Sequence, residues 1–337
     1  MTSNRVTTYS RRASLGLMGA ALTLTLGRRA QAADAVTLRF SASSPPSDFL
    51  SLAMVTFKNE VERSTGGRIV VETYPGNVLF RQGTEIPAIQ RGTLQMSTGQ
   101  TFELADQVPQ YGLFSRAYLL RDYAHLRKVF DGPIGAAYKA AIVSKMGVRI
   151  LCVAYLGTRQ VALRTARHVD GPSDLAGVKL RVPAGPDWQL LGQALGTSPT
   201  PMGMPSVYLG LQTGTIDGEE NPLTILSAAK LYEVTKQVVL TAHMVQPVFF
   251  DIGEPVWQQL ARKDQDAVMN AAAIAQKQND TARLADEAQV LTDLKSRDIT
   301  ITTPNVAAFR ANADRVYADV QSQWDGAVLK QIRSLVS

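Results

Sequence analysis

Apolar and polar positions repeat with two different periods along the chain, which indicates alternating strands and helices after residue 35. Short β-prone stretches predict strands at residues 36–40, 68–73, 94–97, 149–155, 178–182 and 298–302. Helical spacing predicts helices at residues 49–63, 83–91, 187–195 and 205–213. Strands separated by helices imply crossover connections, and therefore a largely parallel sheet with helices on both faces.

The segment at residues 264–296 differs from the rest, because it is rich in alanine and contains no proline or glycine. It predicts one long helix, and residues 305–335 predict two more helices after the last strand. A second α/β segment opens at Gly157 and runs to about Gln246 without a linker before it. We therefore expect the chain to cross several times between two domains.

Composition and charge narrow the class of protein. The length of 337 residues and the hydrophobic fraction of 45% are typical of a globular protein with two domains. The net charge of +6 comes largely from residues 1–32, which hold five arginines and no acid, so 30 of the 35 basic residues remain against 29 acidic ones. Because the chain after residue 32 is nearly neutral, we expect no nucleic-acid partner. The single cysteine, Cys152, excludes internal disulfides and multi-cysteine metal sites.

The basic N-terminus predicts export. Arg11 and Arg12 precede an apolar run at residues 15–26, whose 12 residues are too few for the ~20 that span a bilayer. Ala30 and Ala32 then provide the small residues of a signal-peptidase site. The pattern resembles a twin-arginine signal peptide at residues 1–32, cleaved after Ala32, with a general secretory signal as the alternative. Either route places the mature protein in the periplasm.

Motifs of known catalytic chemistry are absent from the sequence: there is no G-x-S-x-G, no Walker loop and no H-E-x-x-H. His125, His168 and His243 are far apart, and we expect surface or capping histidines. Cys152 lies in an apolar stretch, and we expect a core residue there. The sequence therefore favours a binding protein over an enzyme, with no metal and no cofactor.

Two arginines stand at predicted strand ends. Arg159 follows strand-like residues, and Arg181 closes a strand before Pro183. The carboxyl ends of parallel strands face the ligand crevice of an open sheet, where a guanidinium can bind a carboxylate through two parallel hydrogen bonds. An interdomain salt bridge is the alternative role for either arginine.

Several motifs follow one another in the second half of the chain. They are Gly157-Thr158-Arg159-Gln160, Lys179-Leu180-Arg181-Val182-Pro183, Ser198-Pro199-Thr200-Pro201-Met202, Leu211-Gln212-Thr213-Gly214 and Ile216-Asp217-Gly218-Glu219-Glu220-Asn221-Pro222-Leu223. In these motifs the sequence resembles the solute-binding proteins of TRAP (tripartite ATP-independent periplasmic) transporters, in the branch with C4-dicarboxylate and sialic-acid binders. The resemblance runs from about Val36 to the C-terminus.

The resemblance implies an α/β fold of the two-domain periplasmic-binding-protein clamshell type (type II-like), with mixed, mostly parallel sheets flanked by helices and a long interdomain helix. Domain I would comprise residues 33–156 with 247–285, and domain II residues 157–246 with 286–337. The implied function is to capture a small organic acid and deliver it to the membrane permease subunits. We expect a monomer, and the binding protein of an ATP-driven importer is the alternative class.

The resemblance also implies site residues. Arg181 falls on the arginine that pairs with the ligand carboxylate, Arg159 on a second pocket arginine, Asn221 on a pocket asparagine and Met204 on a position that is often phenylalanine. Without ligand, we expect the Arg181 side chain to be hydrated in an open cleft. The further candidate ligand-binding residues are Gln100, Trp188, Phe102, Phe249 and Ser43.

Three positions depart from the family pattern. Gln100 stands where sialic-acid binders have glutamate and Glu103 where they have arginine, so we do not expect a sialic-acid pocket. Glu219 replaces a glutamine, and we expect its side chain to face solvent. The expected ligand is a monocarboxylate with an apolar or aromatic body, and a C4-dicarboxylate held by both arginines is the alternative.

Overall fold

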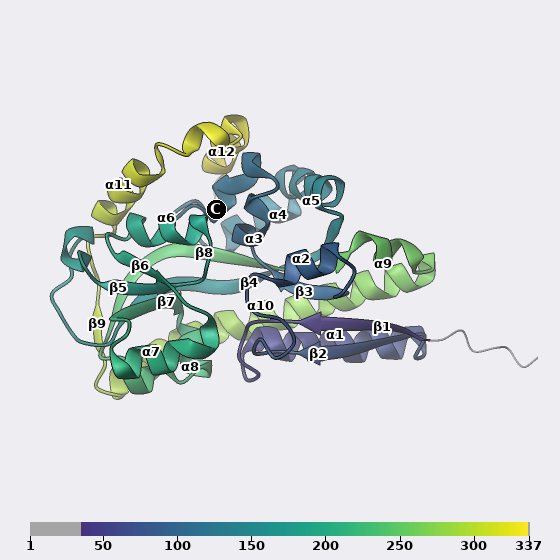
Figure 1. The fold of residues 1–337 in the computed structure, drawn as a ribbon, viewed down its shortest axis with the longest axis horizontal. Coiled ribbons are helices and arrows are strands. Elements are labelled where there is room, and N and C mark those ends of the chain that lie inside the picture. The colour runs from purple at the N-terminus through teal and green to yellow at the C-terminus, as the bar shows by residue number, and fades with distance from the viewer. Residues whose placement is uncertain (1–34, 336–337) are drawn as a thin grey trace, which may run out of the picture. The chain divides into compact units, whose positions relative to one another are not determined.

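The computed structural model describes residues 35–335, so the predicted signal peptide at residues 1–32 lies outside the described residues. The described part contains one sheet of nine strands, in the order β2-β1-β3-β8-β4-β7-β5-β6, with β9 paired to β8 (Figure 1). The strands are β1 Val36–Ser41, β2 Ile69–Tyr74, β3 Met96–Gly99, β4 Val148–Leu163, β5 Lys179–Val182, β6 Ser198–Pro201, β7 Gly218–Pro222, β8 Gln237–Gly253 and β9 Thr300–Thr302.

Helices connect these strands and cover both faces of the sheet (Figure 1). The α-helices are α1 Phe49–Thr65, α2 Glu85–Gln90, α3 Thr101–Ala105, α4 Tyr123–Asp131, α5 Pro133–Met146, α6 Pro186–Ala194, α7 Val207–Thr213, α8 Leu223–Ala228, α9 Glu254–Gln259, α10 Arg262–Ser296, α11 Val306–Tyr317 and α12 Gly326–Ser334. Short 3-10 helices are η1 Pro109–Ser115, η2 Pro172–Leu175, η3 Met204–Ser206, η4 Leu231–Val234 and η5 Gln321–Gln323.

The sheet is mixed and mostly parallel, as the sequence predicts. The pairs β1–β2, β1–β3, β5–β6, β5–β7 and β8–β9 are parallel, whereas β3–β8, β4–β7 and β4–β8 are antiparallel. The two long central strands, of 16 and 17 residues, join the β1–β3 group to the β5–β7 group in one continuous sheet. The division into two domains within this sheet stays a prediction.

Strand β4 continues through Gly157, where the sequence pattern predicts a new segment. The register against β8 shifts between Tyr155 and Gly157, so the strand carries a β-bulge at this point. Gly157 has a φ of 125°, and a Cβ atom there would lie 2.5 Å from the Cβ of Pro222. The glycine therefore marks a bend inside one strand and a close approach of β7.

The long helix α10 has about the length that the sequence predicts, and its polar side chains bind the bulge. The Asn279 side chain donates to the Tyr155 carbonyl at 2.8 Å, and Asp280 accepts from the Tyr155 amide at 2.7 Å. Glu287 accepts from the Thr158 amide at 3.0 Å. Backbone groups freed by the bulge thus find partners on α10, which fixes the helix against β4.

Apolar side chains fill the space between the sheet and each helical layer. On one face Phe40, Phe57 and Phe250 pack edge to face beneath α1 and α10, and Cys152 is buried in the same cluster, as expected. His125 and His243 are also fully buried, so the expectation of a surface position is wrong for both. The His125 ring bonds the Ile332 carbonyl in the last turn of α12, as a capping histidine does. Both rings have hydrogen-bond partners inside the protein, which makes their burial possible.

Candidate ligand-binding site

A cavity opens where the ends of the inner strands meet the loops around them. It encloses about 440 Å³ of empty space, part of which is open to solvent. Its lining comes from β3, β4, β5 and β7 together with α1, α6 and α8. The lining residues are Ser43, Ser44, Pro45, Leu50, Gln82, Thr98, Gln100, Leu156, Arg159, Arg181, Pro183, Trp188, Met204, Asn221 and Ile225.

Seven of the nine residues expected at a ligand site from the sequence line this cavity: Arg181, Arg159, Asn221, Gln100, Met204, Trp188 and Ser43. Phe102 instead stacks on Trp188, with ring centroids 3.6 Å apart, and lines an adjoining cavity. Phe249 does not line the cavity, contrary to expectation. Neighbouring residues of a strand face opposite sides, and Phe249 faces the helical layer of α4 and α5, where it packs on Phe130 and Tyr138.

Arg181 presents a buried positive charge to the cavity. Its Nε donates to the Met202 carbonyl at 2.7 Å and its Nη2 donates to Gln82 Oε1 at 3.1 Å. Within residues 35–335, Nη1 has no protein hydrogen-bond partner, so the guanidinium keeps donors for a ligand. Burial lowers the pKa of Arg181 to about 10, which leaves the group charged at neutral pH.

The burial of Arg181 corrects one expectation. The side chain is 1% exposed, whereas the sequence analysis expects a hydrated guanidinium in an open cleft. Gln82 and the backbone at Met202 contact the guanidinium and exclude bulk water from it. Gln82 lies in a loop before α2. No sequence motif marks this loop, so Gln82 is not among the residues expected at the site.

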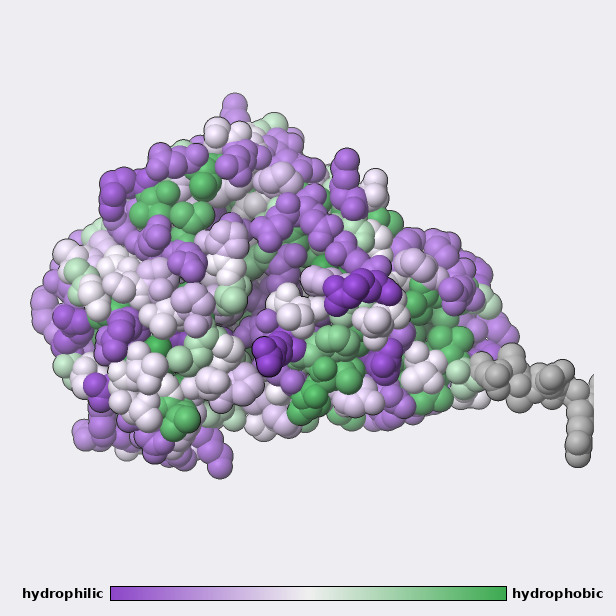
Figure 2. Space-filling model, in the orientation of Figure 1, coloured by the Kyte–Doolittle hydropathy of each residue, from purple (hydrophilic) through white to green (hydrophobic). Residues whose placement is uncertain are grey.

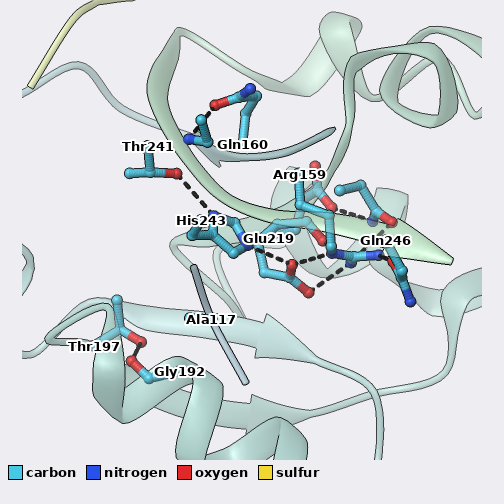
Figure 3. A network of polar contacts seen from close by, with 12 residues as sticks. Ala117, Arg159, Gln160, Gly192, Thr197, Glu219, Thr241, His243 and Gln246 are labelled. Carbon is cyan, nitrogen blue, oxygen red and sulfur yellow. Dashed lines mark hydrogen bonds and ion pairs between the residues drawn. The ribbon is translucent and has the colours of Figure 1, made fainter. Parts of the chain in front are cut away.

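Arg159 is held mainly by protein groups. It lies inside β4, not at a strand end, because the strand continues through Gly157. Its Nε and Nη2 donate to the two carboxylate oxygens of Glu220, and its Nη1 donates to Gln246 Oε1 at 2.5 Å (Figure 3). The guanidinium also lies over the Trp188 ring, 5.0 Å from its centroid. Arg159 therefore has few donors left for a ligand.

Glu220 and His243 form the buried support behind Arg159. His243 Nε2 lies 3.1 Å from Glu220 Oε2, and its Nδ1 lies 2.8 Å from Thr241 Oγ1. Because a carboxylate only accepts, Nε2 donates and Nδ1 accepts from the hydroxyl. Burial alone would raise the pKa of Glu220, but the charge of Arg159 and the hydrogen bond from His243 hold it below its usual value. Burial lowers the pKa of His243, so the ring is neutral at pH 7.

Glu219 is buried completely, so the expectation that its side chain faces solvent is wrong. β7 is an inner strand between β4 and β5, and both faces of the sheet are covered there, so both of its alternating positions are buried. Glu219 Oε2 accepts from Asn221 Nδ2 at 2.5 Å, while Oε1 has no partner within the described residues. Burial raises the pKa of Glu219 to about 7, although the hydrogen bond from Asn221 opposes the shift.

No group of three or more His, Cys, Asp or Glu side chains within residues 35–335 is arranged to hold a metal ion. None of the helices in that range has the length and apolar character needed to cross a membrane. Apolar residues on the face seen in Figure 2 occur in separate groups between polar ones.

Comparisons with known proteins agree with the fold. The profile of the bacterial extracellular solute-binding protein family 7 (DctP) matches residues 40–323. A solute-binding protein from Verminephrobacter eiseniae is 33% identical over 306 residues, which are 90% of this chain and 91% of that protein.

Two TRAP periplasmic solute-binding proteins from Roseobacter denitrificans have similar structures. One, solved with bound 3-deoxy-D-manno-oct-2-ulosonic acid (KDO), is 35% identical with a TM-score of 0.86, and the match covers 90% of this chain and 100% of that one. The other, solved with bound L-galactonate, is 33% identical with a TM-score of 0.81, and the match covers 90% and 99%.

The mixed sheet, the long helix and a cavity with buried arginines fit the class of extracellular solute-binding proteins. Within that class, the chain belongs to the bacterial extracellular solute-binding protein family 7, the solute-binding proteins of TRAP transporters. The family serves transport and not catalysis. Membership in it removes the alternative of an ATP-driven importer.

Proposed function

We propose that this protein captures a small monocarboxylic acid in the periplasm by pairing the ligand carboxylate with Arg181, and delivers it to the permease subunits of a TRAP transporter. The observation that carries the proposal is the guanidinium of Arg181, which is charged, buried and at the cavity with Nη1 unpaired within the described residues. A carboxylate that binds there gains two charge-assisted hydrogen bonds in a place where water competes weakly.

A hydroxylated sugar acid is the ligand class that the cavity favours. Hydroxyl and amide side chains line it at Ser43, Ser44, Thr98, Gln82 and Gln100, and such groups bind hydroxyls. The two relatives from Roseobacter denitrificans, solved with KDO and L-galactonate, support the same class. A C4-dicarboxylate is less favoured, because Glu220 and Gln246 already occupy most donors of Arg159.

The monocarboxylate with an apolar or aromatic body, expected from the sequence, is the second candidate. Apolar side chains also line the cavity, at Leu50, Leu156, Trp188, Met204 and Ile225. These side chains offer a dry surface to an apolar ligand body but no hydrogen-bond partner to the hydroxyl groups of a sugar acid. The two classes therefore differ in which part of the lining they use.

Calorimetric titration of the mature protein decides between these classes. We expect L-galactonate and KDO to bind at least about tenfold more tightly than succinate or phenylacetate, a difference of about 1.4 kcal/mol. Galactitol is the matched neutral control, and we expect it to bind at least about 100-fold more weakly than L-galactonate because it has no carboxylate for Arg181. Tighter binding of succinate or phenylacetate would contradict the sugar-acid assignment, and equal binding of galactitol would contradict the carboxylate anchor.

We also propose that residues 33–156 with 247–285 and residues 157–246 with 286–337 are two domains that close on the ligand. Thr98 and Gln100 lie in the first of these units and Arg181 and Asn221 in the second, and all four line one cavity. Hinged units that share a cavity move together when a ligand bridges them. Small-angle scattering should give the mass of a monomer and a smaller radius of gyration after addition of L-galactonate. A profile that does not change at saturation would argue against closure.

A further inference from the structure

Glu219 places a carboxyl group next to the proposed anchor for the ligand. In the register of β5 and β7, Arg181 and Glu219 are paired, so their side chains leave the same face of the sheet. Asn221, two residues further along β7, shares that face and lines the cavity. The Asn221 amide donates to Glu219 Oε2 at 2.5 Å, and Oε1 has no hydrogen-bond partner within residues 35–335.

The charged and titratable groups around Glu219 come from four strands. They are Arg181 on β5, Arg159 on β4, Glu220 next to Glu219 on β7, and His243 on β8 behind Glu220. Figure 3 shows Arg159, Glu219 and His243 in one network. Glu220 forms an ion pair with Arg159, so these two charges cancel. The His243 ring is neutral at pH 7 because burial lowers its pKa. The charge that Arg181 offers to a ligand therefore depends on the protonation state of Glu219.

We propose that Glu219 links ligand capture to proton uptake, so that an anionic ligand binds Arg181 tightly only when Glu219 carries a proton. The inference rests on the proposed function, in which the ligand carboxylate binds Arg181. When Glu219 is ionised, its charge balances Arg181 before a ligand arrives, and a second carboxylate leaves the buried cluster with an excess negative charge. When Glu219 is protonated, the ligand itself balances Arg181.

The direction of the pH dependence follows from this charge balance. Burial raises the pKa of Glu219 to about 7 without ligand, and a nearby ligand carboxylate raises that pKa further, because two carboxylates in one buried site disfavour joint ionisation. Well below pH 7 the proton is already present, and binding takes up none. Above pH 7 one proton enters with the ligand, so the Kd rises by up to about tenfold per pH unit.

Calorimetric titration with L-galactonate tests this linkage. We expect roughly 20-fold weaker binding at pH 8.5 than at pH 6.5, and uptake of close to one proton per ligand at pH 8.5, measured as the difference between phosphate and Tris buffers. A sugar acid with a carboxyl pKa of about 3.5 is ionised throughout this range, so its own titration does not contribute. This test uses the unmodified protein, so its result does not depend on whether a variant folds.

Glu219→Gln keeps the shape and the amide partner of the side chain but cannot lose a proton. We expect this variant to bind L-galactonate with the same Kd at pH 6.5 and pH 8.5 and with no proton uptake. Glu85→Gln is the matched control, because burial raises the pKa of Glu85 to about 7 as well. Glu85 begins α2 and accepts from the Thr84 amide, whereas Glu219 accepts from the cavity residue Asn221. We expect Glu85→Gln to retain the pH dependence and the proton uptake of the parent protein.

Two results would overturn the linkage. If L-galactonate binds without proton uptake at pH 8.5, or if uptake persists in Glu219→Gln, Glu219 does not control capture, while the proposed function stands. If neither L-galactonate nor KDO binds between pH 6.5 and pH 8.5, the proposed function fails and the linkage fails with it.

Discussion

Arg181→Ala is expected to weaken binding of L-galactonate by roughly 30-fold to several thousand-fold, since truncating one partner of a buried charge pair costs about 2–5 kcal/mol. The guanidinium is 1% exposed and lies at the cavity. In the alanine variant, water therefore does not fully replace the hydrogen bonds that the guanidinium makes to the ligand carboxylate. Arg181→Lys keeps the positive charge but loses the planar fork, and we expect it to lose most of the affinity as well.

Isothermal titration of the parent protein and both variants measures these losses. Arg262→Ala is the control, because Arg262 is 84% exposed on α10 and does not line the cavity. We expect the control to bind like the parent protein. Circular dichroism of each variant checks that the fold is intact. If Arg181→Ala binds L-galactonate as tightly as the parent, the carboxylate anchor is a different residue.

Arg159→Ala is expected to lower the free energy of unfolding by about 3–5 kcal/mol, because it leaves the carboxylate of Glu220 buried without its ion-pair partner. Both residues are buried, and the pair is reinforced by Gln246. Adding Glu220→Gln to Arg159→Ala removes the unpaired charge, and we expect the double variant to be more stable than the single one. Urea unfolding at pH 7 measures the free energy of unfolding of the parent protein, the single variant and the double variant.

The pH dependence gives the Arg159 prediction a second readout. The pKa of Glu220 is lowered in the folded protein, so the pair stabilises the fold above the usual carboxyl pKa and loses this effect as the pH falls. In Arg159→Ala the unpaired, buried carboxyl of Glu220 has a raised pKa and takes up a proton at higher pH, which relieves its cost. The difference between the variant and the parent should therefore shrink between pH 7 and pH 4. A difference below about 1 kcal/mol at pH 7 would contradict the role of Arg159 as a buried ion-pair partner.

Arg159→Lys separates the structural role of this arginine from ligand binding. Most of its donors already bind Glu220 and Gln246, so its contact with a ligand is limited to one hydrogen bond or a bridging water. We therefore expect Arg159→Lys to reduce the affinity for L-galactonate less than Arg181→Lys does.

Local patterns in the sequence predict most of the elements they cover. The first predicted strand, residues 36–40, is Val36–Ser41 in the structure, and the long helix predicted at 264–296 is Arg262–Ser296. Both have a periodicity that depends only on neighbouring residues. The sequence pattern did not show that β4 continues through Gly157, because a glycine inside a bulged strand and a glycine after a strand look alike in sequence.

The sequence likewise predicts some residues of the candidate site and misplaces others. Arg181 and Asn221 lie at the cavity that motif resemblance and strand position favour. Glu219 was misplaced because its burial depends on β4 and β5, which flank β7 in the sheet but lie far from it in sequence. Phe249 was misplaced because an apolar residue in a strand buried on both faces does not reveal which side it faces. Only the three-dimensional arrangement supplies this information.

A crystal structure of the mature protein with L-galactonate tests the carboxylate anchor most directly. We expect the two oxygens of the ligand carboxylate to accept parallel hydrogen bonds of about 2.7–2.9 Å from the Arg181 guanidinium, with the ligand hydroxyls towards Gln82 and Gln100. A ligand whose carboxylate binds another group, with Arg181 still bound only to Met202 and Gln82, would contradict the proposed mode of capture.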